Sequence, residues 1–141
     1  MRPDTFQDFA VDALAAHGTI AGARTLAAIG ESKYPYGLAI RLQGGAEYRW
    51  QITAESAPGD SYATPEQPVD GDPAPAAPAP AGPASGPFGL ADADELLAHV
   101  LTHAHSRQIL SVRRHPAGLT IRCHSKATIY LRALPVPAGR H

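Results

Sequence analysis

The chain carries one pattern twice, at Pro116-Ala117-Gly118-Leu119-Thr120-Ile121-Arg122 and at Pro35-Tyr36-Gly37-Leu38-Ala39-Ile40-Arg41. Both stretches have the form P-x-G-L-x-I-R and lie 81 residues apart (116 minus 35). Proline presets φ at the second position of a turn, and a glycine two residues later can adopt the left-handed conformation of a bulged hairpin. Each copy therefore predicts a hairpin whose second strand begins inside the motif.

The residues around the first copy alternate in the way of strands with one buried face. Residues 24–31 predict a strand ahead of the motif, with Ala27 and Ile29 facing inward. Gly44-Gly45, after the motif, is typical of a tight hairpin turn. The inward side chains expected on the two following strands are Leu38, Ile40, Leu42, Tyr48, Trp50 and Ile52.

The second copy has apolar residues at matching places. The expected inward side chains there are Leu110, Val112, Leu119, Ile121, Cys123, Ile129, Leu131 and Ala133. An amphipathic helix is expected ahead of each set of strands, because apolar residues recur there every three or four positions. Asp4 or Thr5 is the expected N-cap of the first helix. Asp92 is the expected N-cap of the second helix, and Glu95 completes a capping box with it.

Residues 57–88 separate the two copies, and 21 of these 32 residues are Pro, Ala or Gly. Such a segment buries few apolar side chains and is typical of an extended, solvated spacer. We therefore predict a disordered, acidic, Pro/Ala-rich linker at residues 55–90, and a flexible tail at residues 136–141.

The sequence predicts an α+β protein built from two tandem units, each a helix followed by a three-stranded antiparallel meander. The units span residues 1–54 and 91–135. A unit of this size buries little surface on folding and leaves a strand edge exposed. We therefore expect the two units to pack as one pseudo-twofold domain. Pairing of the halves between two chains, in a homodimer, is the alternative left open.

Charge is distributed unevenly along the chain. Residues 55–95 hold eight acidic and no basic residues, whereas residues 96–141 hold seven basic and no acidic ones. No apolar run is long enough to span a membrane, and the opening residues do not resemble a secretory signal. Cys123 is the one cysteine, so no internal disulfide can form. These features predict a cytoplasmic protein without membrane association.

The sequence contains no nucleophile elbow, phosphate-binding glycine loop or dinucleotide fingerprint. His99 and His103 lie one helical turn apart and can present two imidazoles to one metal. However, Cys123 is expected in the core, and His124, its neighbour on a strand, points to the opposite face. We predict no enzymatic activity and no cofactor, and we assign no metal site. Whether His99 and His103 bind a metal stays open.

The remaining candidates lie on the outward side of the predicted strands, where basic residues gather. They are Arg41, Arg49, Arg122, His124, Tyr130 and Arg132. A basic face suits an acidic protein surface, and a basic face with an aromatic side chain also suits single-stranded nucleic acid. We predict a small non-catalytic binding or regulatory protein, an adaptor that acts through a protein partner. Binding of nucleic acid by the basic face of the second unit is the alternative.

Overall fold

The structure is a computed structural model that describes residues 1–80 and 89–135. Two α-helices and six strands occur in these residues, together with one short 3₁₀ helix. In chain order they are α1 (Pro3–Ala15), β1 (Ile20–Thr25), η1 (Ala27–Ile29), β2 (Gly37–Leu42), β3 (Glu47–Glu55), α2 (Leu90–His103), β4 (Ile109–His115), β5 (Gly118–Cys123) and β6 (Thr128–Leu134). The predicted tail 136–141 and residues 81–88 of the predicted linker lie outside the described residues.

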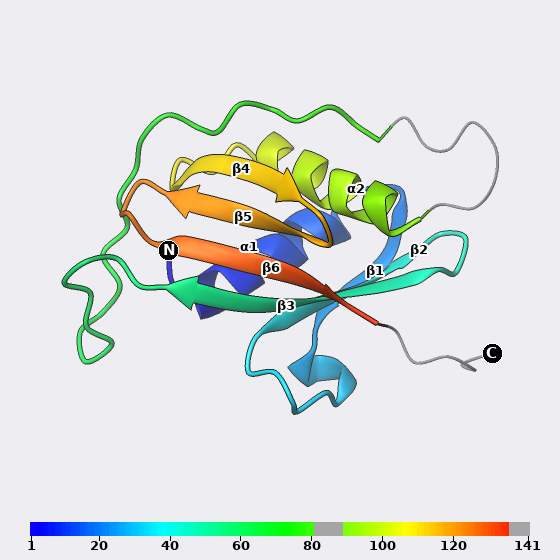
Figure 1. Cartoon of the computed structure of the whole chain (residues 1–141), viewed down its shortest axis with the longest axis horizontal. Helices are drawn as coiled ribbons and strands as arrows, with labels where there is room; N and C mark the ends of the chain where they lie inside the picture. Colours follow the sequence, from blue (N-terminus) through cyan, green and yellow to red (C-terminus); the bar gives the residue numbers. More distant parts are fainter. Residues whose placement is uncertain (81–88, 136–141) are drawn as a thin grey trace.

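All six strands form one antiparallel sheet with the order β1-β2-β3-β6-β5-β4. The central pair, β3 and β6, comes from opposite halves of the chain and runs in register from Arg49↔Leu134 to Glu55↔Thr128. Both helices lie on one side of the sheet, behind it in Figure 1. The predicted α+β class, with an antiparallel sheet, is therefore confirmed.

The core fills the space between the helices and the inner side of the sheet. Of the predicted inward side chains, Trp50, Ile121 and Leu131 are among those almost completely buried. The other predicted strand positions that are buried are Leu38, Ile40, Leu42, Ile52, Leu119, Cys123 and Ile129. Tyr48, Val112 and Ala133 are partly buried at the edge of this core. Period-two alternation thus assigned the inner face of β2, β3, β5 and β6 correctly.

The strand predicted at residues 24–31 is wrong. β1 ends at Thr25, and Ala27–Ile29 forms the 3₁₀ helix η1. Thr25 Oγ1 accepts a hydrogen bond from the Ala28 amide at 3.1 Å, and Gly30 ends the turn with a φ of 84°. A threonine side chain that binds the backbone locally competes with a strand ladder, which explains why the strand stops here.

Leu110 is also misplaced by the prediction, because β4 contains an irregularity that the sequence does not reveal. The register of β4 with β5 shifts between Ile109 and Ser111. An extra residue in one strand reverses the side-chain alternation that follows it. Ile109 is therefore the buried side chain, whereas Leu110 is 47% exposed. β1 has the same kind of shift between Ile20 and Gly22.

The motif glycines do not have the predicted left-handed conformation. In the second copy the residue with positive φ is Ala117 (58°), and neither Gly37 nor Gly118 has positive φ. These glycines are instead packed against the backbone of the next strand. A Cβ on Gly37 would lie 2.6 Å from the Trp50 carbonyl oxygen, and a Cβ on Gly118 would lie 2.1 Å from the Leu131 carbonyl oxygen. Absence of a side chain is what the motif requires.

Both predicted N-caps are displaced by a few residues. Arg2 is the N-cap of α1, with Pro3 in the first turn, where a missing amide hydrogen costs nothing. Gly89 is the N-cap of α2, and its amide donates to Asp92 Oδ2 at 2.8 Å. Asp92 is therefore the third residue of the helix. Its carboxylate still stabilises the positive end of the helix dipole.

Residues 56–80 contain neither helix nor strand, yet they contact the domain. Figure 1 shows the first part of this segment looping beside the N-terminus and the end of β3, and its later part passing along β4 and α2. The Gly71 amide donates to the Arg107 carbonyl at 2.7 Å, and the Ala77 amide donates to Thr102 Oγ1 at 2.8 Å. Ala74 between them is buried. The boundaries 1–54, 55–90 and 91–135 and the disorder of the linker stay predictions.

A pair of substitutions on β5 tests the assignment of its two faces. Replacing Ile121, which is fully buried, by alanine is expected to lower the free energy of unfolding by about 2–4 kcal/mol. Replacing its neighbour Thr120, which points to the other side, should cost less than about 1 kcal/mol. Urea denaturation of both variants measures the difference. Equal losses would show that the face assignment is wrong.

Candidate functional site: the open face of the sheet

The side of the sheet opposite α1 and α2 carries polar side chains that neither of these helices covers (Figure 1). We call this side the open face. It carries Gly22, Arg24, Ala39, Arg41, Glu47, Arg49, Gln51, Thr53, Glu55, Ser111, Arg113, Thr120, Arg122, Thr128, Tyr130 and Arg132. Six of these residues are arginine and two are glutamate. The open face is therefore basic and contains a single aromatic side chain.

Five of the six predicted partner-binding residues lie on the open face, spread over β2, β3, β5 and β6. They are Arg41, Arg49, Arg122, Tyr130 and Arg132. His124 differs, because it follows β5 and its Nε2 lies 2.8 Å from the Asp72 carbonyl oxygen. A Cβ on Gly71 would lie within 2.6 Å of three atoms of its ring. Residues 71–72 therefore pack against the His124 ring.

Three of the predicted residues are engaged with neighbours on the same face. Arg49 forms an ion pair with Glu47, with Nε and Oε2 2.6 Å apart. Arg132 Nη2 donates to Gln51 Oε1 at 2.8 Å. Tyr130 Oη donates to Glu55 Oε1 at 2.6 Å, and this hydrogen bond raises the pKa of the Tyr130 phenol. These groups hold the middle of the open face in a fixed arrangement.

Four exposed arginines on the open face have no such partner. Within residues 1–80 and 89–135, no carboxylate forms an ion pair with Arg24, Arg41, Arg113 or Arg122. Sequence reasoning found Arg41 and Arg122 but missed the other two. Arg24 was assigned to a misplaced strand, and Arg113 follows the shift in β4. In each case the register shift decides which residues of the neighbouring strand the arginine lies beside.

Two hollows of the open face contain these four arginines. Arg113 and Arg122 line one of about 680 Å³, together with Thr120, Thr128 and Tyr130. Arg24 and Arg41 line the other, of about 270 Å³. Glu47 and Arg49 also line the second hollow. Each hollow thus places two guanidinium groups without a carboxylate partner beside one another on adjacent strands.

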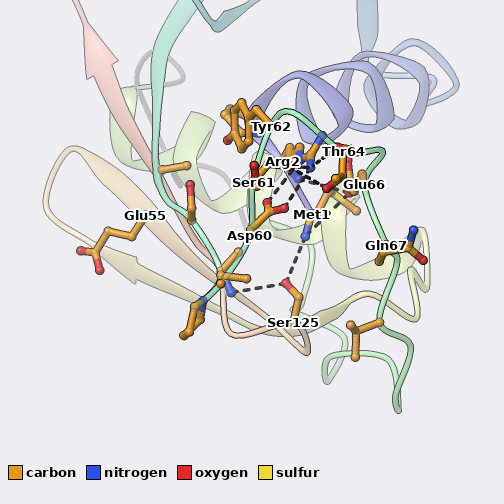
Figure 2. Close-up of a pocket in the computed structure, with 18 of the residues that line it drawn as sticks. Met1, Arg2, Glu55, Asp60, Ser61, Tyr62, Thr64, Glu66, Gln67 and Ser125 are labelled. Carbon is orange, nitrogen blue, oxygen red and sulfur yellow. Dashed lines mark hydrogen bonds and ion pairs between the residues drawn. The ribbon is translucent and has the colours of Figure 1, made fainter.

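A third cavity, of about 260 Å³, lies where residues 54–69 pass the N-terminus. Figure 2 shows that its charged groups face one another. Arg2 Nη2 lies 2.9 Å from Asp60 Oδ1, and the guanidinium stacks 4.5 Å from the ring centroid of Tyr62. Thr5 Oγ1 donates to Glu66 Oε1 at 2.5 Å. Since these groups satisfy one another, the cavity is a structural junction between the linker segment and α1.

Histidines gather where the two helices end. The ring centroids of His17 and His99 are 5.8 Å apart, those of His99 and His103 are 4.0 Å apart, and those of His103 and His105 are 6.2 Å apart. His99 Nδ1 lies 2.9 Å from the Ala77 carbonyl oxygen. No group of three or more His, Cys, Asp or Glu side chains in the described part of the chain is placed to hold a metal ion.

Cys123 is buried at the end of β5. Burial raises the pKa of its thiol, so the thiolate that nucleophilic chemistry needs is disfavoured. The side chain fills core space between the sheet and the helices. This placement agrees with the structural role predicted for Cys123.

Comparison with known proteins adds no family to this description. No helix among residues 1–80 and 89–135 is long and apolar enough to cross a membrane. No protein-family model, curated protein or solved structure matches the chain.

Proposed function

We propose that this protein is a small non-catalytic binding protein, an adaptor or regulator, and that its open face is the surface that holds a protein partner. The observation that carries this proposal is the set of four exposed arginines, Arg24, Arg41, Arg113 and Arg122, which have no carboxylate partner among the described residues. Guanidinium groups on a fixed sheet are well suited to bind carboxylates or phosphates, because their donors are planar and always charged.

We also propose that the domain is a duplication of tandem αβββ units related by a pseudo-twofold axis. The sheet order reads the same from both edges when the halves are exchanged. Gln51 pairs with Arg132, 81 residues further along, which is the offset of the repeated motif. Three backbone hydrogen bonds of the first half have a match in the second half. In the first half they run from Gln43 N to Thr19 O, from Leu42 N to Ala46 O and from Ile52 N to Tyr36 O. In the second half they run, in the same order, from His124 N to Gln108 O, from Cys123 N to Ala127 O and from Ala133 N to Ala117 O.

Pairing of β3 with β6 inside one chain supports packing within the chain over exchange between two chains. The central ladder has seven paired positions, from Arg49 to Glu55 on β3. In this arrangement each half covers the strand edge that it would otherwise leave open. A homodimer is then not needed to complete the sheet.

Nucleic acid is the second candidate partner, and the six arginines beside Tyr130 favour it, since interfaces with nucleic acid are more positive than those with protein. Two features oppose it. Glu47 and Glu55 also lie on the open face, where they repel a phosphodiester backbone. Among the described residues of the open face, Tyr130 is the one Phe, Tyr or Trp side chain that can stack on a base, and single-strand binders combine several such contacts.

Charge reversal on the open face tests this proposal. Wild-type protein and the Arg41→Glu/Arg122→Glu variant are immobilised and used to capture proteins from the native host, and each is titrated with random single- and double-stranded oligonucleotides. We expect one or more proteins to bind the wild type and to be lost from the variant. We expect no mobility shift of the oligonucleotides at physiological salt.

Arg107→Glu is the matched control, since Arg107 is exposed but lies in the loop before β4. Capture of the same proteins by all three baits would place the interaction elsewhere. A mobility shift that weakens steeply with salt and disappears in the charge-reversal variant would replace the protein partner by nucleic acid, because counterion release makes such binding salt-dependent.

A further inference from the structure

We propose that Arg113 and Arg122 form a binding site for a phosphate monoester, and that Arg24 and Arg41 form its weaker counterpart in the first half of the chain. This inference rests on the proposed function and makes it specific: the protein partner presents a phosphorylated side chain to the open face. The ligand class follows from where the guanidinium groups lie and from what surrounds them.

The two arginines of each pair are diagonal neighbours on adjacent strands. Arg113 lies opposite Thr120, and Arg122, two residues after Thr120, lies opposite Ser111. Diagonal cross-strand positions are about 7–8 Å apart, which long side chains can bridge. Because both residues also line the same hollow, two arginine side chains attached at this backbone spacing can both reach one tetrahedral anion between them.

The first half repeats this geometry on β1 and β2. Arg24 lies opposite Ala39, and Arg41, two residues further along, lies opposite Gly22. Both strand pairs also contain a register shift at the corresponding place. Two independent strand pairs therefore set the same two residue types into the same relative position, and each pair lines a hollow.

The surroundings of Arg113 and Arg122 favour an oxyanion with several oxygens. The hollow is lined by hydroxyl groups of Ser111, Thr120 and Thr128, and contains no carboxylate. His115 Nε2 lies 3.0 Å from Thr120 Oγ1, so an imidazole lies within the same group. Arginine and hydroxyl donors together match a phosphate, whose three terminal oxygens accept several hydrogen bonds.

The first hollow differs in its charged residues: Glu47 and Arg49 line it, whereas Arg114 and His115 line the second. Glu47 lines it and is paired with Arg49, whereas the position that pairs with Arg122 on β6 is Thr128. A carboxylate beside the anion lowers its affinity through like-charge repulsion. Arg24 and Arg41 should therefore bind the same group more weakly.

A discrete dianion fits this face better than a continuous nucleic-acid strand. The two pairs lie on opposite halves of the sheet, with three strand spacings, or about 14 Å, between β2 and β5. The arginines between them are engaged, Arg49 by Glu47 and Arg132 by Gln51. A strand crossing from one pair to the other would pass Arg132, which keeps its charge, but also Glu47 and Glu55, whose carboxylates repel phosphates.

The experiment is a titration followed by the NMR signals of the arginine Nε–H groups in the full-length chain. The probes are inorganic phosphate, N-acetyl-phosphoserine methylamide and the same compound without its phosphate. We expect saturable shifts of the Arg113 and Arg122 signals with both phosphate probes, and no shift with the third. The Arg24 and Arg41 signals should respond only at higher concentration.

Arg122→Gln should weaken phosphate binding at the second pair by about tenfold or more, because a charge-assisted hydrogen bond is lost. Arg107→Gln, outside the open face, should leave binding unchanged. Unaltered backbone amide spectra establish that both variants are folded. Absence of a saturable shift with the phosphate probes, or equal shifts with the unphosphorylated probe, would each overturn the inference.

This test can fail without the proposed function failing. If phosphate does not bind but charge reversal still removes a protein partner, the open face holds a partner that is not phosphorylated. If phosphate binds and charge reversal removes no partner, the anion site exists and the proposed adaptor role is wrong.

Discussion

Replacing Gly118 by alanine is expected to lower the free energy of unfolding by about 3 kcal/mol or more. The new Cβ would lie 2.1 Å from the Leu131 carbonyl oxygen and 3.1 Å from His115 Cε1. The first of these atoms belongs to the backbone of β6, so relief requires that two paired strands move apart. Urea denaturation followed by the fluorescence of Trp50, the one tryptophan of the chain, measures the loss.

Gly22→Ala is the matched control for this substitution. Gly22 also lies in a strand, its φ is not positive, and nothing lies within 4 Å of an added Cβ. We expect no loss there, and a small gain because alanine restricts the unfolded chain. Gly37→Ala should be destabilising like Gly118→Ala, since its Cβ would lie 2.6 Å from the Trp50 carbonyl oxygen. Similar stability of all three variants would contradict the close-packing role of the motif glycines.

Replacing Trp50 by alanine is expected to lower the free energy of unfolding by about 3–5 kcal/mol. Trp50 is fully buried, and its Nε1 donates to Asp94 Oδ1 of α2 at 2.9 Å. Asp94 is itself only 2% exposed. The substitution removes core contacts and also leaves a buried carboxyl group without its donor. Circular dichroism during urea denaturation follows this variant, which has no tryptophan fluorescence.

Trp50→Phe helps to separate these two contributions, because it keeps an aromatic ring in the core and removes the donor together with part of the ring volume. Trp50→Phe should lower the free energy of unfolding by about 1–3 kcal/mol, the usual range for a buried polar group that loses its hydrogen-bond partner. Adding Asp94→Leu to Trp50→Phe should recover part of that cost. A loss for Trp50→Phe below the error of measurement would show that the hydrogen bond contributes little.

Asp94 should also make stability depend on pH in a defined direction. Burial raises its pKa, against the opposing effects of the Trp50 hydrogen bond and of Arg114. A carboxyl group whose pKa is higher in the folded than in the unfolded state stabilises the fold most at pH below its unfolded pKa, about 3.9. This contribution is lost as the pH rises through the folded pKa. The stability of wild type minus that of Asp94→Asn should therefore fall with rising pH, and a constant difference would contradict the assignment.

The α+β class, the two helices and the inner faces of four strands could be predicted from the sequence. Alternation with period two and apolar recurrence every three or four residues are local properties, visible in the residues that form the element. Leu38 and Trp50, or Leu119 and Leu131, could therefore be assigned to the core without knowing which strands are neighbours.

The candidate site could be predicted only in part, for the same physical reason. Arg41, Arg122 and Arg132 lie on regular strands, where alternation fixes the outward face. Alternation also puts Arg24 and Arg113 on the outward face. Which arginine each of them lies beside could not be deduced locally, because it depends on the register shifts in β1 and β4. His124 alternates correctly but contacts residue 72, a contact between segments distant in sequence.

The sequence by itself showed that P-x-G-L-x-I-R occurs at both Pro35–Arg41 and Pro116–Arg122, with a glycine at the same place in each. Only the tertiary structure decided why. Positive φ is a property of one residue and its neighbours, whereas the close approach of Gly118 to Leu131 involves the strand that follows. The pairing of β3 with β6 likewise joins segments about 80 residues apart (132 minus 51 is 81). That pairing places all four unpaired arginines on one face, because it sets the two halves side by side with their helices on the same side.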